Sequence, residues 1–314
     1  MHNMTETMAE AINRAQAYCI ATDASTILIG EGVPDEKAMF GTTKDLKTRF
    51  PNQVFDMPVS EAGGTGAMIG AALNGLRPIL THQRMDFSLY SADQLINNAA
   101  KWFSMFGGQR SVPLTIRMTV GRGWGQGNQH SQNLSALYAH IPGLKVFMPS
   151  NAKDAYDMFI EAHLDPNPVL FLEHKWLYNC KELPNEETGD QVTVIAWGYM
   201  FHEAKAWAQR VSGVDLLDLK YLNPINYGRI IASVERTRSL VIMEDSWEKG
   251  SIGESIIAMV AKAGIQLKGP PLHQALPNFY APSTPALAKH YYPEWIEKKE
   301  HDLDPFTNKY VGAI

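Results

Sequence analysis

The chain has 314 residues, of which 45% are hydrophobic and 19% charged, and its formal net charge at pH 7 is −5. This length favours two compact domains, and the acidic balance gives no electrostatic reason to bind nucleic acid or an anionic membrane surface. The two cysteines, Cys19 and Cys180, stand in no metal or redox spacing, which excludes a cysteine-ligated iron–sulfur cluster. Because the sequence has no apolar run of membrane-spanning length and no signal-peptide core, we expect a cytoplasmic protein.

The first 180 residues predict helices and strands in alternation. Apolar residues at helical spacing predict helices over residues 5–18, 44–50, 67–76, 91–106, 137–140 and 152–164. Short apolar runs predict strands over residues 26–30, 54–55, 112–118, 145–148 and 169–173. Thr5 is the expected cap of the first helix, and Asn151 or Ser150 that of the last. Residues 121–127, GRGWGQG, carry glycine at alternate positions and predict a mobile loop.

The alternation restarts after a polar segment over residues 179–190 that is typical of a linker. Strands are predicted over residues 192–196, 214–219 and 239–243, and helices over residues 201–211, 227–236 and 252–263. We therefore expect a first domain over residues 1–180, a linker over 181–191 and a second domain over 192–314, each a mainly parallel sheet flanked by helices. Residues 270–314 are rich in proline and aromatic residues, which predicts an extended arm over an interface.

A glycine-rich stretch over residues 56–87 is the most unusual segment of the first domain. Gly63, Gly64 and Gly66 follow closely on an acidic residue, Glu61. Glycines allow positive φ and close approach to a neighbour or a ligand. We therefore expect this stretch to serve close contact rather than helix stability.

Two interpretations of this stretch compete. With Asp86 downstream, Gly64, Gly66 and Gly70 approximate a dinucleotide-binding fingerprint, but the spacing differs by one residue and Pro58 interrupts the required strand. The other interpretation concerns Glu61, because a carboxylate among small apolar residues at a strand-to-helix turn is suited to proton exchange. From spacing alone, a simpler role for Glu61 as a helix-capping acid is favoured.

Several blocks, in order and spacing, resemble the β subunit of thiamine diphosphate-dependent 2-oxo acid dehydrogenases of the pyruvate dehydrogenase type. They are residues 60–79 (SEAGGTGAMIGAALNGLRPI), 93–97 (DQLIN), 128–132 (NQHSQ) and 141–146 (IPGLKV), followed by Pro149. The resemblance covers nearly all of the first domain and continues more loosely over residues 218–263. It implies a transketolase-like pyrimidine-binding domain followed by a transketolase C-terminal domain.

The resemblance also implies roles for individual residues. Glu61 corresponds to the glutamate that hydrogen-bonds N1′ of the cofactor's aminopyrimidine and drives it toward the imino tautomer that activates the thiazolium carbon. Phe87 corresponds to an aromatic residue that packs on the pyrimidine, and Gly63 and Gln83 fall at cofactor-facing positions. Since the family differs around Gln83 and Arg84, both are candidates for substrate specificity.

His130 corresponds to a family histidine near the reacting carbon, where it would donate a proton or assist acyl transfer to a lipoyl carrier. A structural histidine that hydrogen-bonds the glycine loop is the alternative.

A monovalent-cation site is a further implication. Some members bind K⁺ mainly through main-chain oxygens at positions that align with Leu114, Ala162, His163, Asp165 and Asn167, and such hard oxygen ligands suit this ion. The alternative is a plain helix C-terminus closed by a turn.

The sequence lacks the Gly-Asp-Gly motif and downstream asparagine with which the superfamily holds Mg²⁺ and the diphosphate. Gly189-Asp190 is followed by Gln191 and lies in the predicted linker. The resemblance therefore implies that this chain holds only the pyrimidine half of thiamine diphosphate. An α subunit would supply the diphosphate and Mg²⁺ site, in an α₂β₂ assembly that acts on a 2-oxo acid such as pyruvate.

The sequence departs from the family where the acceptor would enter or a lipoyl acyltransferase would dock. The usual Pro-x-Pro-Tyr segment is replaced by residues 276–282 (LPNFYAP), and an unusual tail follows over 289–314. Three hypotheses remain: a subunit that acylates a lipoyl carrier, a split transketolase-like carboligase that uses a small aldehyde or ketone, and a non-catalytic partner. Retention of Glu61, Phe87 and His130 together argues against the third.

Overall fold

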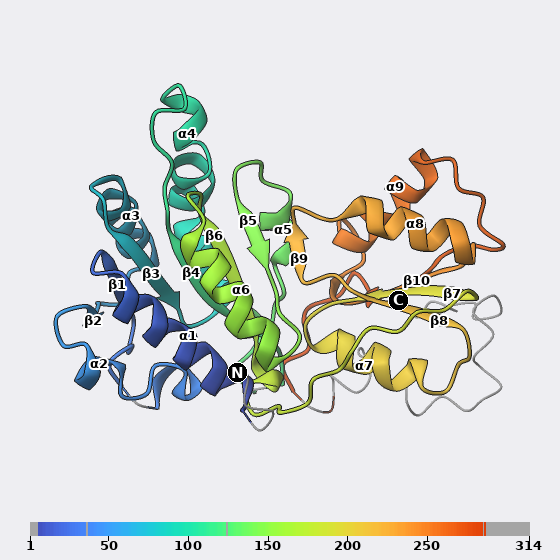
Figure 1. The fold of residues 1–314 in the computed structure, drawn as a ribbon, viewed down its shortest axis with the longest axis horizontal. Helices are drawn as coiled ribbons and strands as arrows, with labels where there is room; N and C mark the ends of the chain where they lie inside the picture. The colour runs from blue at the N-terminus through green and yellow to red at the C-terminus, as the bar shows by residue number, and fades with distance from the viewer. Residues whose placement is uncertain (1–5, 36, 124, 285, 287–314) are drawn as a thin grey trace.

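The computed structural model describes residues 6–35, 37–123, 125–284 and 286 (Figure 1). Its larger sheet has the order β2-β1-β3-β4-β6-β5-β9, in which all neighbours are parallel except β5 and β9. Its strands are β1 (Thr26–Gly30), β2 (Val54–Asp56), β3 (Arg77–His82), β4 (Thr115–Val120), β5 (Lys145–Phe147), β6 (Val169–His174) and β9 (Tyr221–Asn223). A second sheet, of order β11-β10-β7-β8, is wholly parallel. Its strands are β7 (Val192–Ala196), β8 (Val214–Asp218), β10 (Leu240–Trp247) and β11 (Leu272–Leu276).

Helices cover both faces of each sheet, which confirms the predicted α/β class. The α-helices are α1 (Met8–Thr22), α2 (Leu46–Arg49), α3 (Glu61–Leu73), α4 (Trp102–Met105), α5 (Ser135–Ala139), α6 (Ala152–Leu164), α7 (Tyr199–Ala208), α8 (Tyr227–Thr237) and α9 (Ile252–Lys262). In Figure 1, α1 and α6 lie side by side on one face of the larger sheet, and α7 lies across the second sheet from α8 and α9. None of the helices in the described ranges has the length and apolar character that crossing a membrane requires.

The two sheets share one continuous hydrophobic core. Buried apolar side chains run from Met68 on α3 and Leu80 on β3 to Leu240 on β10 and Ile256 on α9. In addition, β9 lies in the second half of the sequence but pairs with β5 of the larger sheet. The second half of the chain is therefore packed firmly against the first.

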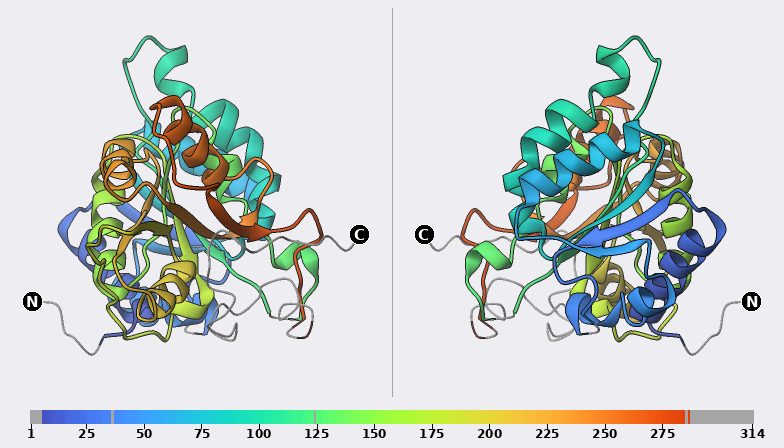
Figure 2. Two further views of the ribbon diagram at one scale, coloured as in Figure 1. Left: turned by 90° about the vertical axis from the view of Figure 1, so that its right-hand side faces the viewer. Right: turned by 90° about the vertical axis from the view of Figure 1, so that its left-hand side faces the viewer.

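The helix predicted over residues 91–106 is wrong in form. The chain there makes a 3₁₀ segment η2 (Met85–Ser91), a π-helical segment η3 (Gln94–Ala99) and the short α4, which projects beyond the rest of the molecule (Figure 2). The Asn98 side chain donates to the main-chain oxygen of Asp93, while the main-chain N–H of Ala100 bonds Leu95 five residues back. Apolar periodicity alone does not detect such side-chain competition for the helical backbone.

The helices predicted over residues 5–18 and 67–76 begin at other residues. Thr5 lies outside the described residues, and Thr7 caps α1 through a reciprocal capping box with Glu10. In the glycine-rich stretch α3 already begins at Glu61, because Ser60 accepts the N–H of Gly63.

The expected positive φ of the glycines in this stretch is not observed. Gly63, Gly64 and Gly66 are all helical. At Gly64 the lack of a side chain serves packing instead, since a Cβ there would collide with the end of the Met57 side chain.

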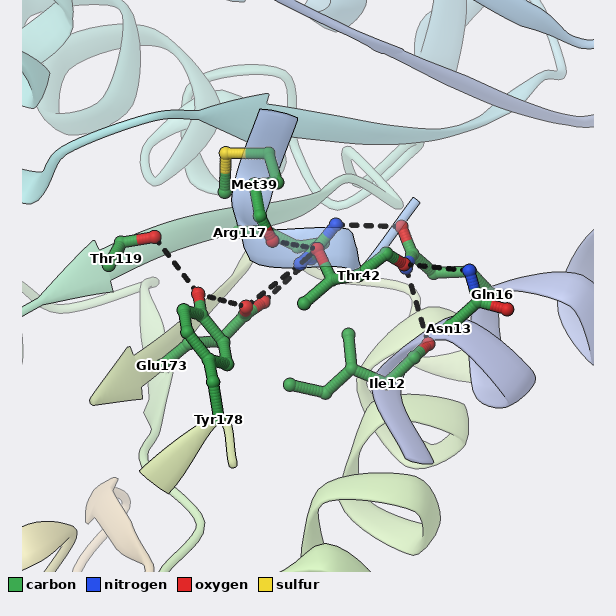
Figure 3. Close-up of polar contacts among 9 residues, drawn as sticks. All are labelled: Ile12, Asn13, Gln16, Met39, Thr42, Arg117, Thr119, Glu173 and Tyr178. Carbon is green, nitrogen blue, oxygen red and sulfur yellow. Dashed lines mark hydrogen bonds and ion pairs between the residues drawn. The ribbon is translucent and has the colours of Figure 1, made fainter. Parts of the chain in front are cut away.

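A buried ion pair joins the centre of the larger sheet to α1 (Figure 3). Arg117 on β4 makes two hydrogen bonds of 2.6 and 2.8 Å to the carboxylate of Glu173 on β6, and both side chains are fully buried. The same guanidinium donates to Gln16 and Thr42, and Tyr178 donates to Glu173 at 2.7 Å. Every charge in this network therefore has a partner, which is the condition for burying an ion pair.

Candidate active site

A cavity of about 360 Å³ opens beyond the carboxyl ends of β1 to β3. The strand order reverses between β1 and β3, and ligands of open α/β sheets bind at such a switch point. The residues that line it come from the loops after these strands, from α3 and from the glycine loop: Glu31, Val59, Glu61, Gln83, Arg84, Phe87, Tyr90, Gln126 and His130.

Glu61 stands in the first turn of α3, and its side chain lines the cavity while only 8% of the residue is exposed. The N-cap itself is Ser60, so capping does not require Glu61. A carboxylate there is stabilised by the positive end of the helix dipole and still faces the cavity. The arrangement therefore suits a carboxylate that must act on a ligand.

Glu31 is a cavity residue that the sequence analysis missed. It follows β1 directly, and its Oε1 is buried with no hydrogen-bond partner among the described residues. Burial, and then the nearby charge of Glu61, raises the pKa of Glu31. A ligand with hydrogen-bond donors would relieve this pair of facing acids. The signal in the sequence was the position of Glu31 at the carboxyl end of a buried strand.

Phe87 and His130 form an aromatic wall of the cavity. Their ring centroids lie 4.9 Å apart with the planes nearly perpendicular, and the ring of Tyr90 stacks on Phe87 with a centroid distance of 6.4 Å. The Nδ1 of His130 is buried without a hydrogen-bond partner among the described residues, while its main-chain N–H donates to Gly127. The loop thus holds His130 through its backbone, and the residue forms part of the cavity wall.

The remaining predicted cofactor residues, Gln83 and Gly63, and the specificity candidate Arg84 differ in position. Gln83 lines the cavity and donates to the main-chain oxygen of Glu31 at 3.1 Å. Arg84 also lines it, and burial lowers the pKa of Arg84. Gly63 lies in the first turn of α3 outside the cavity wall, so its part in cofactor binding stays a prediction.

The loop over residues 121–133, which begins with the glycine-rich segment and carries His130, is anchored from the second sheet. Asp245 on β10 accepts hydrogen bonds from Arg122 at 3.3 Å and Asn133 at 2.6 Å, at the two ends of the loop, and from His174 at 3.1 Å. Burial alone would raise the pKa of Asp245, but the hydrogen bond from His174 and the charge of Arg122 lower this pKa to about 2. Asp245 therefore stays ionised and fixes the position of the loop.

The predicted cation residues gather where β4 and β6 begin, at the edge of the sheet opposite the cavity. The main-chain oxygen of Leu114 accepts from Val169, and that of His163 accepts from Arg77 at 2.8 Å. Asp165 pairs with Lys145 and also accepts from Asn167.

The Nε2 of His163 lies 3.0 Å from the Thr26 hydroxyl, and Ala162 is buried beside it in α6. Burial, with the charge of Arg77, lowers the pKa of His163 to about 4. A K⁺ ion at this position stays a prediction. The positive side chains of Arg77 and Lys145 already contact His163 and Asp165 there.

The dinucleotide interpretation finds no support. Gly64, Gly66 and Gly70 lie inside α3 rather than in a phosphate-binding turn, and Asp86 accepts the main-chain and side-chain N–H groups of Gln132.

Comparisons with known proteins agree with this arrangement. Residues 5–181 match the family model described as transketolase, pyrimidine binding domain, and residues 182–295 match transketolase, C-terminal domain. The chain is 36% identical to the β subunit of acetoin:2,6-dichlorophenolindophenol oxidoreductase of Bacillus subtilis, over 91% of this chain and 93% of that protein. It is 34% identical to the mitochondrial pyruvate dehydrogenase E1 component subunit beta-2 of Oryza sativa subsp. japonica, over 85% of this chain and 77% of that protein.

A solved structure, an inactive β4 tetramer of a split-gene transketolase, has the same fold, with a TM-score of 0.75 and 19% identity over 91% of this chain and 93% of that one. The chain therefore belongs to the transketolase-like family that includes the β subunits of pyruvate dehydrogenase E1 and of acetoin:2,6-dichlorophenolindophenol oxidoreductase.

Proposed function

We propose that the chain is the β subunit of a thiamine diphosphate-dependent 2-oxo acid dehydrogenase, acting on pyruvate or a related 2-oxo acid together with an α subunit. One observation carries the proposal: Glu61, Phe87 and His130, which are far apart in the sequence, line a single cavity. The identity to β subunits of this type, over most of both chains, supports it.

The cavity residues fit the aminopyrimidine half of the cofactor. The volume of about 360 Å³ lies within the range of about 300–1,000 Å³ that ligand pockets occupy. The Oε1 of Glu31 and the Nδ1 of His130 lack partners among the described residues, and buried polar atoms normally have them. A flat heterocycle with ring nitrogens and an amino group would supply such partners and pack against Phe87.

The other half of the cofactor would be held by the partner. The sequence has no Gly-Asp-Gly motif for Mg²⁺ and diphosphate. Beside the cavity, Val59 and Tyr90 are 81% and 70% exposed, and clustered exposed apolar groups are typical of an interaction surface. An α subunit over this mouth would complete the site and exclude water from it.

In this assembly the residues of the chain have distinct tasks. Bound thiamine diphosphate supplies the electron sink for decarboxylation of the 2-oxo acid. Glu61 holds and moves a proton at N1′ of the pyrimidine, and Phe87 orients that ring. His130 stands beside Phe87 in the cavity wall, where its imidazole can transfer a proton to the substrate oxygen or to the acceptor.

Replacing His130 with asparagine should reduce acyl transfer to a lipoyl carrier by about 10²- to 10⁴-fold, since a positioned acid–base group contributes that much. The assembled enzyme would be assayed with a lipoyl domain and, separately, with an artificial electron-accepting dye. Dye reduction should fall less, because it needs no acyl transfer. The matched control is His140→Asn, at an exposed histidine outside this cavity. Unchanged lipoyl acylation in the His130 variant would contradict the role of the histidine.

A carboligase is the second candidate, and one contact favours it. The divergent segment over residues 276–282 lies directly on the loop that carries His130, because the side chain of Asn128 donates to the main-chain oxygen of Ala281 at 2.9 Å. Gly125 donates to Ser283 next to it. The chain thus differs from its family where an acceptor would approach. Carbon–carbon bond formation with a small aldehyde, without any lipoyl protein, would favour this candidate over the dehydrogenase.

A further inference from the structure

A thiol, a carboxylate and an imidazole lie close together, away from the cavity of the candidate active site. They belong to Cys180 at the end of the predicted first domain, to Glu182 at the start of the predicted linker, and to His202 in the first turns of α7. One ligand atom from each residue lies within 4.8 Å of the other two, and the Nδ1 of His202 is 3.8 Å from the Glu182 carboxylate. Nothing in the proposed function uses these groups.

The ring of His202 is oriented as metal-binding histidines are. Its Nε2 lies 2.6 Å from the main-chain oxygen of Ser150, which can only accept, so the proton of the neutral ring is on Nε2. The lone pair is therefore on Nδ1, the atom that faces Glu182. Ligating histidines typically donate their second N–H to a backbone carbonyl in this way. The ring also stacks nearly parallel on Tyr199, which further fixes it.

Cys180 is held equally firmly by its backbone. Its N–H donates to Leu177 at 2.9 Å, and its carbonyl accepts from Met8 at 3.1 Å. Burial raises the pKa of Cys180. A hydrogen bond from the main-chain N–H of Glu182 acts in the opposite direction, because it favours the thiolate, but its effect is smaller. A bound cation would offset the cost of placing this thiol beside a carboxylate.

We propose that Cys180, Glu182 and His202 bind one divalent transition-metal ion of the zinc type, with water as a fourth ligand. Sulfur and nitrogen donors select such ions over Mg²⁺ or Ca²⁺. Tetrahedral zinc places its ligand atoms about 3.4–3.6 Å apart, so only a small contraction is needed, and the side chain of Glu182 is 82% exposed and free to move. The ion would tie the end of the first domain and the start of the linker to α7, away from the cavity of the candidate active site.

The test is metal binding by the full chain after chelator treatment and dialysis. Titration with Co²⁺ should reach one ion per chain, with a near-ultraviolet thiolate-to-cobalt absorption that Zn²⁺ abolishes and Mg²⁺ does not. The variants Cys180→Ser and His202→Gln should each lose about tenfold or more in cobalt affinity. The thiolate absorption should be absent in the serine variant. Cys19→Ala, at the buried cysteine of α1, is the matched control and should bind as the native chain does.

Any of three results would overturn the proposal. They are failure of the native chain to bind cobalt stoichiometrically, binding without the thiolate-to-cobalt absorption, and binding by both the Cys180 and the His202 variants as tight as that of the native chain. His202→Gln leaves both cysteines intact and decides the matter should the Cys180 variant fold poorly.

Discussion

Replacement of Glu61 with glutamine is expected to lower 2-oxo acid decarboxylation by the assembled enzyme by about 10²- to 10⁴-fold. Glutamine keeps the size and the hydrogen-bonding capacity but cannot exchange a proton at the pyrimidine. Because Ser60 supplies the N-cap, α3 should form as before and assembly with the α subunit should persist. The measurement is the steady-state rate together with the mass of the complex in solution.

The control for this variant is Glu235→Gln, at an exposed position on α8 far from the cavity in sequence and fold. It removes the same charge from the same chain and should keep the native rate. Full activity in the Glu61 variant would refute the assigned role, and loss of the complex would mean that the residue acts in assembly instead.

Replacement of Glu173 with glutamine is expected to lower the free energy of unfolding by about 3–5 kcal/mol. The change leaves the fully buried guanidinium of Arg117 without its counter-charge, between β4 and β6. Equilibrium urea unfolding of the native and variant chains measures the difference.

A surface ion pair provides the comparison for the buried one. Lys153 and Asp157 lie 2.8 Å apart on one turn of α6, and about half of each side chain is exposed. Lys153→Gln should cost less than about 1 kcal/mol. If the Glu173 variant were as mild as this one, the network around Arg117 would not be a main determinant of stability.

The sequence predicted the parts of the site that depend on local chemistry. Glu61 and Phe87 stand in or near sequence blocks that resemble the family, and the strand over residues 26–30 follows from a continuous apolar run. His130 was predicted through the block around it, and the cavity brings it to Phe87. Such residues are found because the chemistry restricts both their type and their neighbours in the chain.

The sequence could not predict contacts that the sheet order creates. Glu31 faces Glu61 only because β1 and β2 are parallel neighbours beside the switch point. Asp245 reaches the glycine loop only because the second sheet packs against the first. The strand β9 leaves its own domain to pair with β5, and three residues carry no signal for that choice. Each of these depends on the pairing of distant segments, which local patterns do not encode.

The central claim is that this chain holds half of a cofactor site, and cofactor binding tests it most directly. Thiamine diphosphate with Mg²⁺ would be titrated calorimetrically into the isolated chain and into the complex that co-purifies with it, with the partner identified by mass. We expect Mg²⁺-dependent binding only in the complex, with a partner that carries the Gly-Asp-Gly motif. Mg²⁺-dependent binding by the isolated chain, with turnover of a 2-oxo acid, would contradict the account.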